Sequence, residues 1–303
     1  MVLTRTPRDT LLAPLQAVSG IIERRHTLPI LLNVLIEKNG ETLTLLATDI
    51  EIQITISTPA GSEGNGAVTV GARKLLDILR SLPENAEVSL QLDDKRLQIK
   101  SGKSRFNLQT LPASDFPCMA IAEGEARSLS LPQNQLRCLL GQTLYAMALQ
   151  DVRYFLNGLL LIIEGSELRA VATDGHRLAY SSTTLKGHDN LALQDLIIPR
   201  KTVIELNRLL ADSEEPVNID ILPTQVRFRF GQITLVSKLI DGRFPDYQRV
   251  IPAALRTVIQ VNRLQLLQSL ARAAILTTEK FRGVRLVLAE GSLKITAANS
   301  EQE

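Results

Sequence analysis

The strongest constraint on the fold is an internal repeat of about 125 residues. Three segments, which begin at Asp9, Asn134 and Asn262, have the pattern of amphipathic helices in one register. Each begins with a residue that favours the N-cap of a helix, and leucines follow at matching positions. The second segment begins 125 residues after the first, and the third begins 128 residues after the second. The chain therefore reads as copies of one structural unit.

Each of these helices is followed by a β-hairpin, whose turn carries Gly40, Gly165 or Gly291. The first two copies continue with a strand, an Arg-Lys pair, a second helix and further strands, and both end at a Phe-Pro corner. These elements predict an α+β fold in which helices cover one face of antiparallel sheets. The predicted domains are 1–126, 127–252 and a partial third domain, 253–303.

Length qualifies this prediction, because three full repeats would need roughly 375 residues. The chain has 303, and its third copy stops after one helix and one hairpin. We therefore expect two complete repeats and a truncated third, with apolar faces and strand edges left open in that third repeat.

Composition excludes several classes of protein. Hydrophobic residues make up 45% of the chain and charged residues 22%, which is the ordinary globular range. No apolar segment reaches the ~20 residues of a membrane helix, and the N-terminus lacks the apolar core of a signal peptide. These features predict a cytoplasmic protein without a membrane partner. Cys118 and Cys138 are too few for a zinc site, and we expect them to be buried or neutral.

The segment Thr173–Leu178 is the strongest candidate for catalysis, because Asp174 and His176 lie close together in it. A glycine between them indicates a turn, and no serine stands in a G-x-S-x-G elbow. The matching place in the first repeat, Thr48–Glu51, has no histidine. We therefore predict a turn that shapes a surface, with no catalytic residue, cofactor or metal; an enzyme that uses His176 is the competing reading.

Basic residues recur at matched positions of the repeat. Arg73-Lys74 and Arg200-Lys201 stand at the start of the two second helices, and Arg24-Arg25 is expected to end the first opening helix. A single Arg-Lys pair would indicate only a helix face exposed to solvent. Repeated helices on one side of a sheet, however, would align these charges into a surface that contacts phosphates without reading bases.

Several motifs resemble those of the bacterial sliding clamps, the beta subunits of DNA polymerase III, and the likeness covers essentially the whole chain. The segments that carry it are Thr27–Leu31, Ala72–Lys74, Thr110–Pro117, Gln150–Gly158, Ala172–Leu178, Pro199–Lys201, Asp241–Tyr247 and Lys280–Arg285.

The resemblance implies a DNA polymerase processivity factor rather than an enzyme. In this family three α+β domains form each chain, and two chains close head to tail into a ring around duplex DNA, with helices lining the hole. DNA contacts map onto Arg25, Arg73, Gln150 and Tyr154. Phe155 replaces a tyrosine of some members, and the repeated pair adds Arg200 and Lys201 to this predicted surface.

The resemblance also implies a pocket for partner proteins, which insert a short segment with glutamine and large apolar residues. The expected partners are the replicative polymerase subunit, the clamp loader, and other polymerases and repair proteins. The predicted pocket residues are Arg153, Thr173, Gly175, His176, Arg177, Leu178, Pro245 and Val250.

A homodimer interface is implied if the third domain is complete. Its predicted residues are Lys74, Arg96, Lys103, Arg105, Phe106 and Leu108 of the first domain, with Ile275, Leu276, Glu301 and Glu303 of the third. An apolar centre rimmed by opposite charges would favour one register of the two chains. The alternative function is a monomeric or defective clamp relative, which binds DNA or partners without closing a ring.

Overall fold

The structure is a computed structural model of the chain. It describes residues 1–61, 64–93, 95–120, 122, 124, 126–187, 191–254, 257–277 and 283–297. The chain divides into a larger unit, Met1–Pro245, and a smaller unit, Asp246–Glu303. Among the described residues, no helix is long and apolar enough to cross a membrane.

The larger unit contains the first and second repeats. In the first repeat, antiparallel strands pair in the order β1-β6-β7-β8-β5-β2-β3-β4. Their alternating burial is what the period of two in the sequence predicts. The strands are β1 (Val2–Pro7), β2 (Asn33–Asn39), β3 (Thr42–Thr48), β4 (Ile52–Pro59), β5 (Gly66–Gly71), β6 (Glu87–Asp93), β7 (Arg96–Ser101) and β8 (Ser104–Leu111).

The second repeat has the same plan. One group of strands pairs in the order β9-β14-β15-β16 and the other in the order β12-β11-β10-β13. The strands are β9 (Arg127–Pro132), β10 (Gly158–Gly165), β11 (Glu167–Thr173), β12 (Leu178–Thr184), β13 (Leu191–Pro199), β14 (Pro216–Ile221), β15 (Gln225–Phe230) and β16 (Ile233–Lys238).

The two repeats are joined by strand pairing. Strand β16 pairs antiparallel with β4, from Ile233 opposite Ile56 to Ser237 opposite Ile52, so one sheet runs across both repeats. We call this pairing the β4–β16 joint. The hairpin turns of the repeat are also confirmed, because Gly40 and Gly165 have φ angles of 55° and 60° that suit glycine.

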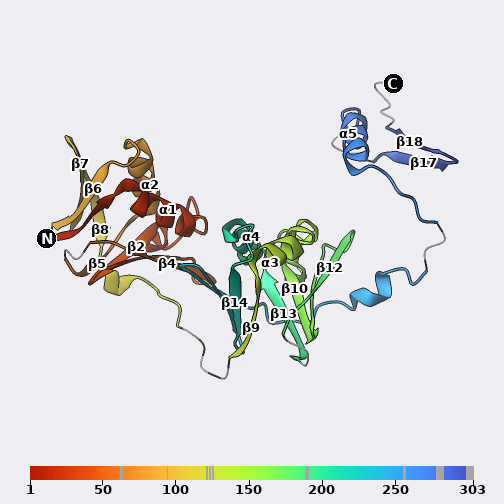
Figure 1. Cartoon of the computed structure of the whole chain (residues 1–303), viewed down its shortest axis with the longest axis horizontal. Helices are drawn as coiled ribbons and strands as arrows, with labels where there is room; N and C mark the ends of the chain where they lie inside the picture. Colours follow the sequence, from red (N-terminus) through yellow and green to blue (C-terminus); the bar gives the residue numbers. More distant parts are fainter. Residues whose placement is uncertain are drawn as a thin grey trace. The chain divides into compact units, whose positions relative to one another are not determined.

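Helices cover one face of these sheets, as predicted (Figure 1). In the first repeat α1 and α2 pack against each other and against β2, and in the second repeat α3 and α4 pack together in the same way beside β10–β13. The helices are α1 (Arg8–Ser19), α2 (Ala72–Ser81), α3 (Gln133–Gly141) and α4 (Arg200–Leu209), and short 3₁₀ helices are η1 (Pro29–Leu32), η2 (Ala113–Asp115), η3 (Leu144–Ala146), η4 (Tyr154–Leu156) and η5 (Tyr247–Val250).

The predicted N-caps Asp9 and Asn134 are wrong. Pro7 and Pro132, the last residues of β1 and β9, hold the N-cap positions instead, and no side chain caps either helix. The reason is that each strand runs directly into its helix, where a main-chain acceptor from a neighbouring loop is already in reach. Arg8 N–H donates to Ala86 O at 2.8 Å, and Gln133 N–H donates to Glu215 O at 2.9 Å.

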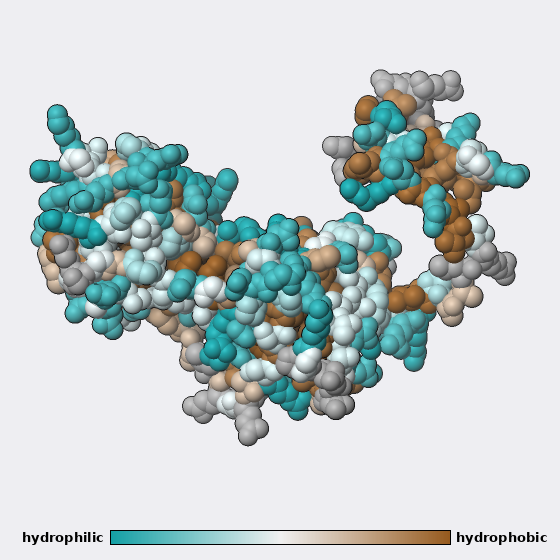
Figure 2. Space-filling model, in the orientation of Figure 1, coloured by the Kyte–Doolittle hydropathy of each residue, from teal (hydrophilic) through white to brown (hydrophobic). Residues whose placement is uncertain are grey.

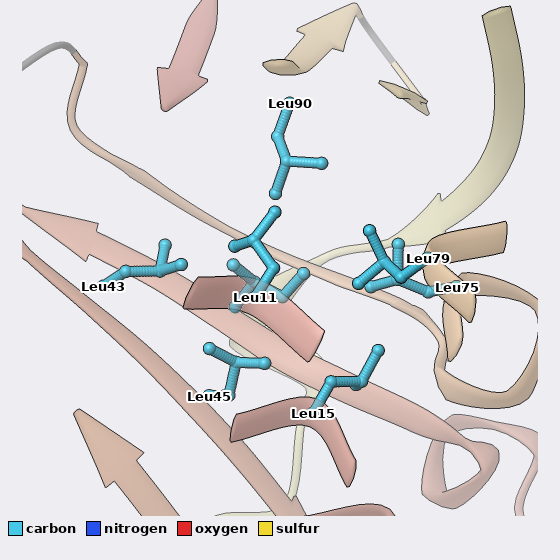
Figure 3. Close-up of a pocket in the computed structure, with 8 residues that line it drawn as sticks. Leu11, Leu15, Leu43, Leu45, Leu75, Leu79 and Leu90 are labelled. Carbon is cyan, nitrogen blue, oxygen red and sulfur yellow. The ribbon is translucent and has the colours of Figure 1, made fainter. Parts of the chain in front are cut away.

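A leucine-rich core fixes the helices to the sheet. In the first repeat, side chains from α1, α2 and β3 converge with Leu90 of β6 (Figure 3). They leave a cavity of only about 10 Å³, which is too small and apolar to hold more than one water. Each fully buried leucine contributes about 1.5–3 kcal/mol to folding, so this core holds α1 and α2 on the sheet. The converging leucines are Leu11, Leu15, Leu43, Leu45, Leu75, Leu79 and Leu90.

The smaller unit contains α5 (Arg263–Ala274), β17 (Arg285–Ala289) and β18 (Ser292–Thr296). The predicted N-cap Asn262 is confirmed, because its Oδ1 accepts a hydrogen bond from Gln265 N at 3.1 Å. The predicted hairpin is confirmed by the pairing of β17 with β18. None of the described side chains of α5 or β17 is buried, and Figure 2 shows hydrophobic residues over this unit.

Candidate functional site

Three of the predicted basic residues are exposed and form no ion pair with a described carboxylate. Arg73 and Lys74 lie in the first turn of α2, and both are exposed. Arg25 is also exposed, but it lies in the loop after α1, which ends at Ser19, rather than on that helix. None of the three forms an ion pair with a described carboxylate. Their guanidinium and ammonium groups are therefore available to an anionic partner.

The matching pair in the second repeat is bound to the protein itself. Arg200 Nη1 donates to Met147 O at 2.9 Å. Lys201 Nζ binds Glu23 Oε1 at 3.1 Å and also the carboxylate of Asp49, so it links α4 to the first repeat beside the β4–β16 joint. Burial lowers the pKa of Lys201, but the two carboxylates outweigh this effect and raise it overall. The two Arg-Lys pairs stand at equivalent positions of the repeat, but only the pair in the first repeat has side chains that are not already bound by described residues of the protein.

The turn around His176 is a hydrogen-bonded surface feature. Thr173 Oγ1 donates to Arg177 O at 2.7 Å and accepts from Gly175 N at 3.1 Å. Asp174 Oδ1 accepts from the main-chain N–H groups of His176 and Arg177, each at 3.0 Å. These two main-chain bonds lower the pKa of Asp174. Gly175 has a φ of 87°, which explains a glycine at this position.

The first repeat has the same turn without the glycine. Thr48 Oγ1 donates to Ile52 O at 2.9 Å and accepts from Ile50 N at 3.0 Å. Asp49 Oδ1 accepts from Glu51 N at 3.0 Å and from Ile52 N at 2.8 Å. Ile50 has a φ of 80°, a strained conformation for a β-branched residue. Because the same hydrogen bonds form in the first repeat without a histidine, the turn does not depend on His176 for its structure.

The loop before β10 presents two predicted DNA contacts. Gln150 is exposed with a φ of 56°, and Tyr154 is 57% exposed. Asn157 braces the loop: its Oδ1 accepts from Asp151 N at 2.9 Å, and its Nδ2 donates to Asp151 O at 2.8 Å. Phe155 is half-buried, with its ring edge-on to Tyr154 at 5.8 Å between centroids. The brace holds Gln150 and Tyr154 toward solvent.

Arg153 lies over the second-repeat turn. Its Nε and Nη2 donate to the two oxygens of Asp151 at 3.0 and 2.9 Å, and these bonds lower the pKa of Asp151 to about 2. Nη2 also lies 3.4 Å from Asp174 O. A Cβ atom on Gly175 would lie 3.0 Å from this nitrogen, so the glycine also makes room for the guanidinium.

The remaining predicted pocket residues lie in different parts of the chain. Leu178 begins β12 and is half-buried, whereas Pro245 is the exposed last residue of the larger unit. Val250 belongs to the smaller unit and is 67% exposed. The sequence prediction missed Tyr145, which is exposed beside Arg177; nothing in the local pattern marks it, because η3 is too short to give a periodic signal.

The predicted dimer residues of the first repeat cluster around β8. Arg105 and Lys103 are exposed, while Phe106 and Leu108 pack against the core from the same strand. Strand β8 pairs with β7 along its length but with β5 only at Thr110 and Leu111. Among the described strands, most of its second edge is therefore unpaired, with Lys74 of α2 and Arg96 of β7 also exposed. In the smaller unit, Ile275 and Leu276 are exposed, and Glu301 and Glu303 lie outside the described residues.

Other candidates give no reactive site. The sequence predicts that Cys118 and Cys138 are buried or neutral; both are exposed, so the first of these alternatives is wrong. Burial of part of its surface and the charge of Glu37 raise the pKa of Cys118. His26 Nδ1 accepts a hydrogen bond from Leu28 N, and His188 lies outside the described residues. Within the described ranges, no group of histidine, cysteine and acidic side chains could hold a metal ion.

Comparison with known proteins decides the family. Profiles of the N-terminal, central and C-terminal domains of the DNA polymerase III beta subunit match residues 4–120, 130–246 and 248–303. The beta sliding clamp of Salmonella typhimurium is 49% identical over 300 residues, which are 98% of this chain and 80% of that protein. The Escherichia coli K12 clamp is 47% identical over 297 residues, with the same coverage. The chain belongs to the beta sliding clamp family.

Solved sliding clamps have the same fold. The DNA polymerase III beta subunit of Pseudomonas aeruginosa superposes with a TM-score of 0.92 at 44% identity, over 100% of this chain and 82% of that one. A second structure of that protein, bound to griselimycin, gives a TM-score of 0.93. The sequence-based prediction of an α+β clamp fold is confirmed. As a sliding clamp, the chain is a non-catalytic processivity factor of DNA replication, so the reading as an enzyme is wrong.

Proposed function

We propose that this clamp closes its ring at the open edge of β8, head to tail with the third domain of a second chain. In the larger unit, the last strand of the second repeat meets β4 of the first repeat. Strand β8 holds the place of β16 in the first repeat, because each is the last strand of its meander. Its unpaired edge suits a contact with the third domain of a second chain. We keep the proposed domain boundaries at 1–126, 127–252 and 253–303.

The single observation that carries this proposal is the unequal pairing of two equivalent strands. Strand β16 is covered on both sides, by β15 and β4, whereas no described strand pairs with most of one edge of β8. Open edges favour pairing with another chain. Because the two surfaces of such a contact differ, it is heterologous, and a head-to-tail contact of this kind forms a ring when the rotation between the chains closes. Lys74, Arg96, Lys103, Arg105, Phe106 and Leu108 would line this interface with Ile275, Leu276, Glu301 and Glu303.

The helices would face the DNA. Arg25, Arg73, Gln150 and Tyr154 supply exposed donors on the larger unit, and contacts of this kind bind phosphates without sequence preference. Weak, salt-screened contacts suit a ring that must slide. Phe155, Arg200 and Lys201 stay predicted DNA contacts, although the last two are engaged by Met147 O and by carboxylates. A role in DNA replication supports the cytoplasm as the proposed location of the protein.

An Arg73→Ala variant should bind duplex DNA less tightly at low salt, with the salt dependence of binding reduced. Loss of one phosphate contact is expected to lower the slope of log K against log [salt] by about one. Fluorescence anisotropy of a labelled duplex between 20 and 200 mM salt, that is over roughly one decade of ionic strength, measures this slope. Arg73→Lys is the matched control, because it keeps the charge and therefore the slope. An unchanged slope in Arg73→Ala would remove Arg73 from the DNA surface.

Retention on DNA should depend on topology. A clamp loaded by its loader onto nicked circular DNA is expected to stay bound, and to be lost when the circle is cut, because the ring then slides off the ends. Gel filtration of the protein–DNA complex before and after cutting measures retention. Equal retention on cut and uncut DNA would contradict ring closure and favour the monomeric DNA-binding alternative. Sedimentation velocity gives the chain count independently.

We further propose that partner proteins dock at the second-repeat turn. Arg153, Thr173, Gly175, His176, Arg177, Leu178 and Pro245 of the larger unit would bind the partner segment. Two exposed guanidinium groups beside a rigid turn offer polar anchors of the kind that peptide sites use. The replicative polymerase subunit, the clamp loader, and other polymerases and repair proteins would share this site.

A further inference from the structure

The guanidinium of Arg177 is held in place on three sides. Its Nε donates to Asp174 Oδ2 at 3.1 Å, and its Nη2 donates to Tyr145 O at 2.7 Å. The ring of Tyr145 covers its face, with Cζ 5.5 Å from the ring centroid. The Arg177 side chain is nevertheless 57% exposed. A long, flexible side chain at the surface is thus fixed in one orientation.

Tyr145 is itself firmly placed. It lies in η3, between Leu144, which packs against the core, and Ala146, which is fully buried. The N–H of Ala146 donates to Thr143 O at 3.0 Å and closes the turn. These anchors turn Tyr145 outward, where 53% of it is exposed. Its exposure therefore results from the fold of η3 rather than from disorder of the loop.

A guanidinium group has five N–H donors. One donor of Arg177 is used by Asp174 and one by Tyr145 O. The other three have no acceptor among the described residues. Because Asp174 already accepts two main-chain N–H groups with its second oxygen, it is fixed as well. The three free donors consequently point in a direction that the protein sets before any ligand arrives.

We propose that Tyr145 is a positioning residue of the partner pocket, which orients Arg177 so that its free N–H groups meet an oxygen acceptor of the docked partner segment. This inference rests on the proposed function of the second-repeat turn. Tyr145 acts in two ways: its main-chain carbonyl fixes one Nη2 donor, and its aromatic face attracts the cation. Pre-ordering a rotamer-rich side chain reduces the entropy lost on binding.

The experiment compares Tyr145→Leu, which removes the aromatic face, with Tyr145→Phe, which keeps it; both variants keep the main-chain carbonyl. The probe is a fluorescein-labelled decapeptide with one glutamine and three large apolar residues, and anisotropy gives its Kd. Exposed cation–π contacts predict that Tyr145→Leu binds about two- to fivefold more weakly. Tyr145→Phe should bind like the unaltered chain. In an Arg177→Met background, Tyr145→Leu should have no further effect, because the group that it positions is gone.

Each result separates the inference from the function on which it rests. If Arg177→Met weakens binding but Tyr145→Leu does not, the positioning role of Tyr145 is overturned and the pocket stands. The same role is overturned if Tyr145→Leu weakens binding equally with and without Arg177, because the loss then arises from general packing. If the unaltered chain does not bind the peptide, or Arg177→Met binds it with unchanged Kd, the proposed pocket fails and the role of Tyr145 fails with it.

Discussion

The Asp220→Ala variant is expected to lose about 3 kcal/mol of unfolding free energy, near the low end of what breaking a buried ion pair costs. The Asp220 side chain, on β14, is only 2% exposed. It accepts hydrogen bonds from Ser128 Oγ at 2.7 Å and from Arg227 Nε at 2.9 Å, and Arg229 Nη2 lies 3.0 Å away. Removing it leaves two guanidinium groups side by side. Their partial exposure to water keeps the expected cost moderate.

The pH dependence of stability gives this prediction a second readout. Burial raises the pKa of Asp220, but the hydrogen bond from Ser128 and the two arginines outweigh burial, so the folded pKa is lowered. The stabilisation is therefore complete above the unfolded pKa of about 3.9 and is lost as the pH falls through the lower folded value. The difference in unfolding free energy between the unaltered chain and Asp220→Asn should shrink below about pH 4.

Urea denaturation measures both effects. Unfolding is followed by far-UV circular dichroism, because the chain contains no tryptophan whose fluorescence could report it. Asp220→Asn is the matched control because it keeps the shape and can still accept from Ser128. If Asp220→Ala lowers the unfolding free energy by less than about 1 kcal/mol, Asp220 contributes no more than an ordinary surface ion pair does. A difference that stays constant from pH 7 to pH 3 would show that charge is not its source.

The repeat was sufficient to predict the fold class, because periodicity and glycine turns report the local backbone directly. It could not predict the N-caps. Asp9 and Asn134 are good capping residues, yet main-chain acceptors from Ala86 and Glu215 make a side-chain cap unnecessary. Those acceptors are about 80 residues away in the chain. Capping here is decided by tertiary contacts that no local pattern contains.

Equal motifs can also hide unequal roles. The sequence treats Lys74 and Lys201 alike, since each follows an arginine at the start of a second helix. The structure separates them, because Glu23 and Asp49 reach Lys201 across the β4–β16 joint, whereas no described carboxylate binds Lys74. In the same way, Ile50 adopts a glycine-like φ that its side chain disfavours. The hydrogen bonds of Thr48 and Asp49 impose that conformation, and residue type alone argues against it.

Amide hydrogens of α5 and β17 should exchange far faster than those of the larger unit. A helix of 12 residues is marginal in water without tertiary packing, and so is an isolated hairpin. No described side chain of α5 or β17 is buried; Leu264, Leu267 and Leu286 are each more than half exposed. We expect protection factors below roughly 10 in α5. In β3 and β10, where most side chains are buried, we expect values above about 10³.

Hydrogen exchange read by mass spectrometry of peptic fragments tests this difference within one sample, with β3 and β10 as internal controls. The measurement should be made over a dilution series of the 303-residue chain, because contacts from a second copy would protect α5 only at higher concentration. Strong protection of α5 at the lowest concentration would contradict the prediction. Protection that rises with concentration would instead show that a second chain covers the apolar residues of α5, since the helix itself buries none of them.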